Sequence, residues 1–158
     1  MVGNITLIDL VNLVFITGVF YGLVFSSTLF LMKRKIGKPL LFLNLQVLFI
    51  TLNNLQAWLI DMNIVSSFVY IRYLRLPWFV LCMPMFYMFL VRYLKLSRNT
   101  YRVLEVTIVL FLAFVLLRTG LIYHTQQQGF SEGETKAFMD KYSSIEEIVC
   151  YLYTLTIF

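Results

Sequence analysis

Long apolar runs separated by short polar connections dominate the chain. A helix rises about 1.5 Å per residue, so about 20 consecutive apolar residues are needed to cross about 30 Å of hydrocarbon. Several runs in this sequence reach or approach that length before charged or turn-forming residues interrupt them. The pattern predicts an all-α polytopic transmembrane helix bundle, with helices at about 7–32, 39–60, 76–94, 103–123 and 145–158.

The last of these helices is expected to be incomplete. Its apolar run reaches Phe158 after only about half of the length that a membrane crossing requires, and no polar stretch closes it. We therefore expect four complete helices and a truncated fifth, in a native protein that continues beyond this residue.

A polar segment precedes the expected fifth helix. Residues 124–144 are rich in Gln, Glu and Ser and predict an extracytoplasmic loop. Ser143 or Ser144 is expected to cap the helix, with Glu146 or Glu147 completing a capping box. These carboxylates would also oppose the positive end of the helix dipole.

The composition agrees with a membrane protein. Hydrophobic residues make up 60% of the 158 positions and charged residues only 13%. Soluble domains have about 45–50% apolar and about 25% charged residues. An integral membrane protein is therefore predicted, with the lipid bilayer as its main partner.

Lysine and arginine gather in two connections, one between the first and second expected helices and one between the third and fourth. By the positive-inside rule both connections face the cytoplasm, which puts the N-terminus outside a cytoplasmic (inner) membrane. The net charge of +5 is then largely a topology signal. The predicted cytoplasmic anchors are Lys33, Arg34, Lys35, Lys38, Arg92, Lys95, Arg98 and Arg102.

Residues for catalysis or metal binding are scarce. The single histidine, His124, has no Cys, His or carboxylate at ligand spacing, and Cys82 and Cys150 show no pairing pattern. No HExxH motif, phosphate-binding glycine loop or Ser/His/Asp arrangement is present. We expect no enzyme activity, no cofactor and no metal, and a packing role for the two cysteines.

The second helix carries an unusual number of amides. At 100° per residue, Gln46 and Asn53 nearly coincide and Gln56 lies close to both, whereas Asn44 and Thr51 share another face. The face of Gln46, Asn53 and Gln56 should point into the bundle. Two interpretations remain open: interhelical hydrogen bonds, or a polar cavity that binds an unknown small ligand.

Three arginines lie near the outer end of the bundle. Arg72 and Arg75 are three residues apart just before the third helix, and Arg118 is near the outer end of the fourth. They can form an interfacial belt, with Arg118 extending toward water. Alternatively, they form an anion-recognising lip over the amide face.

Two further positions bear on helix geometry. Pro84 lies inside the third helix, where it frees a backbone carbonyl and predicts a hinge that relays an outside event to the cytoplasm. Gly18, Gly22 and Ser26 follow small-xxx-small spacing on the first helix. That face predicts close helix packing, either within the bundle or in a homodimer.

Several stretches resemble a known family. The glycine-bearing first helix, the KRK connection, the LLFLNL start of the second helix and PMFYMFLVRYLK occur in succession. This succession resembles the N-terminal membrane region of membrane-bound AraC-type transcriptional regulators, with Pro84, Phe86, Tyr87 and the segment 91–94 as its most telling part. The resemblance implies a cytoplasmic domain with two helix-turn-helix units, which this chain lacks, so DNA would be bound only through that missing C-terminal domain.

The predicted function is therefore the membrane-embedded signal-input or anchoring region of such a regulator. Related helix bundles also precede sensor histidine kinases, so the input domain of a kinase is an alternative. A fragment of a small polytopic transporter is a third possibility, with the amide face lining the pathway.

Overall fold

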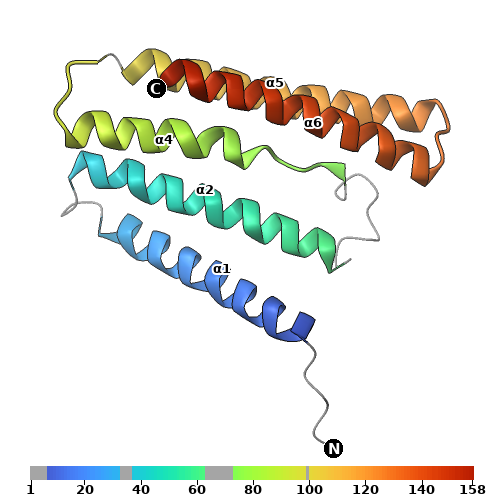
Figure 1. The fold of residues 1–158 in the computed structure, drawn as a ribbon, viewed down its shortest axis with the longest axis horizontal. Helices are drawn as coiled ribbons and strands as arrows, with labels where there is room; N and C mark the ends of the chain where they lie inside the picture. Colours follow the sequence, from blue (N-terminus) through green and yellow to red (C-terminus); the bar gives the residue numbers. More distant parts are fainter. Residues whose placement is uncertain (1–6, 33–36, 63–72, 99) are drawn as a thin grey trace, which may run out of the picture.

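The computed structural model describes residues 7–32, 37–62, 73–98 and 100–158, with side chains from Leu10 onward. These residues form helices and no strand, which confirms the all-α prediction. The helices are α1 (Leu7–Leu31), α2 (Lys38–Asp61), α4 (Trp78–Tyr93), α5 (Thr100–Gln127) and α6 (Glu132–Ile157) (Figure 1).

Three of the described helices are long and apolar enough to cross a membrane. They are α1 from Leu10, α2 over its whole length and α5 over its whole length. The fourth apolar helix, α4, has 16 residues and is shorter than a usual crossing. These features identify the chain as a membrane protein.

The short helix α4 forms the centre of the molecule. It packs most extensively against α2 and also contacts α5 and α6. Half of its side chains are buried, and Met85, Tyr87, Met88 and Val91 form a cluster with Ile157 at the end of α6. A helix surrounded in this way buries its apolar side chains against neighbouring helices, so its stability depends on packing.

The expected loop 124–144 is largely helical, which corrects the sequence-based boundaries. The first residues of that segment complete α5, a turn follows in which Gly129 has φ 68°, and α6 already begins at Glu132. The capping box is formed by Ser131 and Glu134, not at Ser143 or Ser144. The Glu134 carboxylate accepts from the Ser131 backbone N–H at 2.9 Å.

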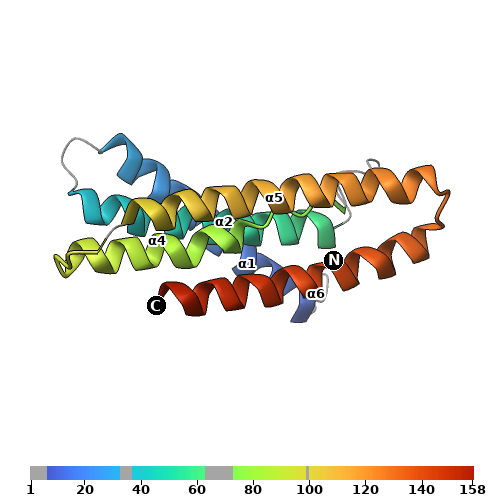
Figure 2. The same cartoon turned by 90° about the horizontal axis from the view of Figure 1, so that it is seen from above.

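The helices α5 and α6 form an antiparallel pair that extends along α4 (Figures 1 and 2). The buried positions of α6 are Thr135, Met139, Glu146, Cys150 and Ile157, at steps of four or seven residues that keep one face inward. These buried positions lie both before and after residue 145, where the sequence predicted that the helix begins. This explains why one continuous helix forms.

The helix ends on either side of the two connections that were predicted to face the cytoplasm lie at one end of the bundle. There α1 ends and α2 begins, and α4 ends and α5 begins (Figure 1). Lys38 is the first residue of α2, and Arg92 lies in the last turn of α4. The geometry is thus compatible with the predicted topology.

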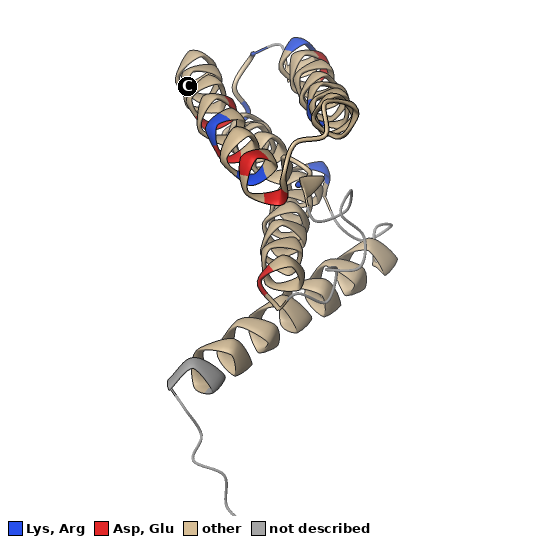
Figure 3. Ribbon diagram, turned by 90° about the vertical axis from the view of Figure 1, so that its right-hand side faces the viewer, with Lys and Arg blue, Asp and Glu red and all other residues tan. Residues whose placement is uncertain are grey.

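Helix α1 packs mainly against α2 and lies apart from α4, α5 and α6 (Figure 3). Its described side chains include no charged residue, and most of its large apolar side chains are exposed. At the contact, a Cβ atom on Gly22 would overlap the Thr51 hydroxyl, and Asn44 donates from Nδ2 to the Ser26 carbonyl at 3.2 Å. Two members of the predicted small-residue face, Gly22 and Ser26, therefore lie against α2 in the same chain.

Candidate ligand-binding cavity

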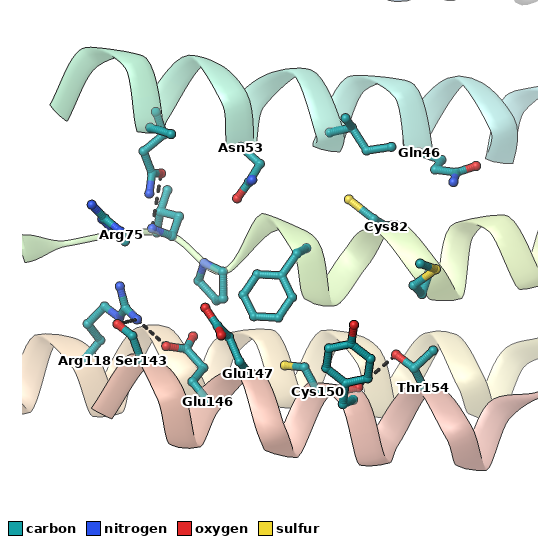
Figure 4. Close-up of a pocket in the computed structure, with 18 residues that line it drawn as sticks. Gln46, Asn53, Arg75, Cys82, Arg118, Ser143, Glu146, Glu147, Cys150 and Thr154 are labelled. Carbon is teal, nitrogen blue, oxygen red and sulfur yellow. Dashed lines mark hydrogen bonds and ion pairs between the residues drawn. The ribbon is translucent and has the colours of Figure 1, made fainter. Parts of the chain in front are cut away.

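A cavity of about 590 Å³ lies between α2, the segment 74–77, α4, α5 and α6 (Figure 4). Small-molecule sites in proteins are usually about 300–1,000 Å³ and are mostly apolar with a few placed polar groups. Apolar residues from α2, α4 and α6 make much of this lining, including Ile50, Phe79, Met83 and Tyr151. The cavity therefore has the size and character of a small-molecule site.

The amide face of α2 forms one wall. Gln46, Asn53 and Gln56 all line the cavity, as do Ile50 and Ala57, because positions 46, 50, 53 and 57 share one side of a helix. Gln46 and Asn53 form no hydrogen bond with another residue in the described part of the chain. Their amides remain available to a molecule in the cavity.

Gln56 has a different environment. Its Oε1 accepts from the Trp78 ring N–H at 3.0 Å and from the Leu76 backbone N–H at 3.2 Å. These bonds fix the segment before α4 and the first turn of α4 against α2. The two sequence-based interpretations of the amide face thus apply to different residues: Gln56 joins helices, whereas Gln46 and Asn53 face the cavity.

Helix α6 forms the opposite wall with residues that the sequence analysis treated only as a helix start. Ser143, Glu146, Glu147, Cys150 and Thr154 line the cavity. They recur at helical spacing, which places them on one face. The signal that could have located them is the apolar stripe of α6, in which a carboxylate replaces an apolar residue at position 146.

Arg118 of α5 and Glu146 of α6 form a buried ion pair. Their side chains are only 5% and 1% exposed, and the Arg118 guanidinium also donates to the Ser143 hydroxyl at 3.0 Å. The guanidinium carbon lies 5.5 Å from the centre of the Tyr142 ring. Arg118 therefore does not extend toward water, and its charge is compensated within the protein.

Two charged residues of the lining are exposed. Arg75 precedes α4, Glu147 lies on α6, and neither forms an ion pair with another described residue (Figure 4). Of the predicted outer lip, Arg75 and Arg118 line the same cavity, whereas Arg72 lies outside the described residues.

The two cysteines lie on this cavity as well. Cys82 on α4 and Cys150 on α6 are free thiols and are 8% and 4% exposed. The Cys82 thiol donates to the Trp78 carbonyl at 3.4 Å. No metal-binding group of three or more His, Cys, Asp or Glu residues occurs among the residues that the structure describes.

Pro84 lies inside α4, which runs through it from Trp78 to Tyr93. It is among the most deeply buried residues of the molecule, with less than 2% of its surface exposed. It does not line the cavity, but Cys82 and Met83 directly before it do. Its role as a hinge stays a prediction.

The predicted cytoplasmic anchors lie away from the cavity where they are described. Arg92 stacks over the Phe42 ring at 4.8 Å, Arg98 donates to the Tyr87 hydroxyl at 3.4 Å, and Lys38, Lys95 and Arg102 are exposed. Lys33, Arg34 and Lys35 lie outside the described residues.

Comparison of the chain with protein-family models, with curated proteins and with solved structures gave no match.

Proposed function

We propose that the chain is the membrane-embedded signal-input domain of a membrane-bound transcriptional regulator of the AraC type, and that its cavity receives the signal as a small ligand. The observation that carries this proposal is the cavity of about 590 Å³ with free amides on α2 and charged groups on the facing elements. Ionisable residues within membrane helices are costly, so they usually mark functional sites.

The path of the helices supports a role in signalling. The cavity touches α2, α4, α5 and α6, so a bound ligand contacts every described helix except α1. Helix α6 runs from the turn at Ser131 toward the end with the basic connections (Figure 1). With the N-terminus outside an inner membrane, a domain that follows α6 would be cytoplasmic.

This proposal predicts that the gene encodes a cytoplasmic DNA-binding domain after α6. The reading frame after Phe158 in the gene tests it. A further membrane segment followed by a domain with two helix-turn-helix units supports the regulator. A histidine kinase domain would favour the sensor-kinase alternative, and further membrane helices before a stop codon would favour a transporter.

The direct test of signalling uses the full-length protein with a reporter fused to the promoter of its own gene. Asn53→Trp fills the cavity, so the reporter output should change by severalfold, whereas Glu105→Gln, an exposed change on α5 away from the cavity, should leave it unchanged. An output that is the same in both variants, at equal protein levels, would contradict the proposal.

A further inference from the structure

The charged residues around the cavity balance one another. Two cations, Arg75 and Arg118, and two carboxylates, Glu146 and Glu147, line it. A site that is neutral as a whole favours neither a simple anion nor a simple cation. The predicted role of Arg118 in recognising an anion is weakened because Glu146 already compensates its charge.

The other two charges are arranged differently. Arg75 and Glu147 belong to different walls of the cavity, are exposed and form no ion pair with another described residue (Figure 4). Charged side chains in a membrane bundle normally find a partner of opposite charge. A ligand that carries both charges would satisfy Arg75 and Glu147 together.

The other residues that line the cavity indicate what the uncharged part of such a ligand would contact. Gln46 and Asn53 offer amide donors and acceptors that no described residue uses. Phe79, Met83 and Tyr151 offer apolar surface. The combination suits a molecule with two opposite charges and an attached apolar part.

We propose that the cavity binds a small zwitterion, with its ammonium group at Glu147 and its anionic group at Arg75. This inference rests on the proposed function, because it names the class of ligand that the cavity receives. The same chemistry occurs in a free amino acid with an apolar side chain and in the phosphoethanolamine headgroup of a lipid.

The two native cysteines offer a direct measure of occupancy. The protein is reconstituted in nanodiscs of phosphatidylglycerol, and the rate at which N-ethylmaleimide alkylates Cys150 is measured in a Cys82→Ser variant. L-Leucine is the free zwitterion, whereas leucinamide and 4-methylpentanoate each carry one of its two charges. Nanodiscs that also contain phosphatidylethanolamine supply the lipid headgroup.

A free zwitterion predicts that leucine slows alkylation and that each single-charge analogue is at least about tenfold weaker. Glu147→Gln and Arg75→Gln should abolish the protection by leucine, Glu147→Asp should keep part of it, and Glu105→Gln should keep all of it. Protection only with phosphatidylethanolamine, lost in the same two variants, would identify the lipid headgroup as the source.

The inference would be overturned if neither leucine nor phosphatidylethanolamine protected Cys150. It would also be overturned if a single-charge analogue protected Cys150 as well as leucine does, or if protection survived in Glu147→Gln and Arg75→Gln. Size-exclusion profiles of each variant show whether it is folded. The alkylation assay reads binding alone, whereas the promoter reporter with Asn53→Trp reads signalling. A failure of the zwitterion and a failure of the proposed function are therefore distinguishable.

Discussion

Arg118 and Glu146 connect α5 to α6 through an ion pair that is almost completely shielded from solvent. The pair lies beside the cavity and is extended by the hydrogen bond from Arg118 to the Ser143 hydroxyl. Within the described part of the chain, Glu146 Oε1 and Arg118 Nε have no hydrogen-bond partner. The attraction between the charges therefore has to offset most of their desolvation.

Removing one partner of this pair should destabilise the bundle strongly. Glu146→Leu leaves the Arg118 guanidinium buried without its partner, a change that typically costs about 3–5 kcal/mol. The free energy of unfolding in a denaturing-detergent titration measures the loss. The double variant Arg118→Leu with Glu146→Leu should recover most of it, because no charge is left uncompensated.

The exposed Glu105 on the same helix as Arg118 provides the control. Glu105→Leu should change the unfolding free energy little. If Glu146→Leu were equally mild, the ion pair would not hold α5 and α6 together.

The start of α6 should depend on pH. Hydrogen bonds from the Ser131 side chain and backbone lower the pKa of the exposed Glu134 carboxyl. A carboxyl with a lowered pKa in the folded state contributes stability that is present above its unfolded-state pKa, about 4.3, and lost as the pH falls through the lower folded value. The protection of the amides in the first turn of α6 against hydrogen exchange, relative to their intrinsic exchange rates, should therefore fall in this acidic range.

Gln at position 134 can form the same capping box without a titrating group. Glu134→Gln should keep the first turn protected and remove its pH dependence, whereas Ser131→Ala should weaken protection at every pH. A loss of protection at acidic pH that persists in Glu134→Gln would assign the effect to another group.

The sequence alone predicts the α2 wall of the cavity but not the α6 wall. The amides of α2 are visible because polar residues stand out in an apolar helix, and their shared face follows from helix periodicity alone. The partners on α6 are hidden because the first half of this helix is polar and the spacing of Ser143 and Glu146 also fits a helix cap. Both cap patterns satisfy the local rule, and in the structure the helix begins at the one that starts with Ser131.

Helix periodicity also cannot predict that residues of the amide face have different roles. Gln56 and Asn53 are similar side chains on one face, yet Gln56 is held by Leu76 and Trp78. Those partners come from a segment about 20 residues further along the chain, so their approach depends on tertiary structure. The short apolar run of α4 likewise gives no sign that it forms the buried centre.

The contact between α1 and α2 should be sensitive to a single methyl group. A Cβ on Gly22 would overlap the Thr51 side chain, whose hydroxyl is held by the Val47 carbonyl at 2.8 Å. Gly22→Ala should therefore destabilise the pair by about 1–3 kcal/mol, the usual range for overpacking. The double variant Gly22→Ala with Thr51→Gly should restore stability, as measured in the same detergent titration.

Gly18 is the matched control, because no atom lies within 4 Å of a Cβ placed on it. Gly18→Ala should leave the stability of the monomer unchanged. The homodimer predicted for this face is tested with the same variants by crosslinking in nanodiscs. Loss of a dimer in Gly18→Ala would indicate that Gly18 lies between two copies, whereas equal destabilisation by both alanine variants would contradict the described contact.

Gln56 should matter for structure more than Asn53 does, although both line the cavity. Gln56→Leu removes the acceptor for the Leu76 backbone N–H and the Trp78 ring N–H, and each unsatisfied buried donor costs about 1–3 kcal/mol. Fluorescence of Trp78 in a Trp58→Phe background should shift as the indole loses its partner. Gln56→Glu, which keeps an acceptor, should retain more of the wild-type spectrum.

Asn53→Leu serves as the comparison, because no described residue bonds to the Asn53 side chain. It should leave both the unfolding free energy and the Trp78 spectrum close to wild type, while reducing any ligand protection of Cys150. If Asn53→Leu and Gln56→Leu had the same effect on stability, the amide face would act as one structural unit. In that case Asn53 would stabilise the bundle, and of the two cavity amides only Gln46 would remain as a candidate for binding the ligand.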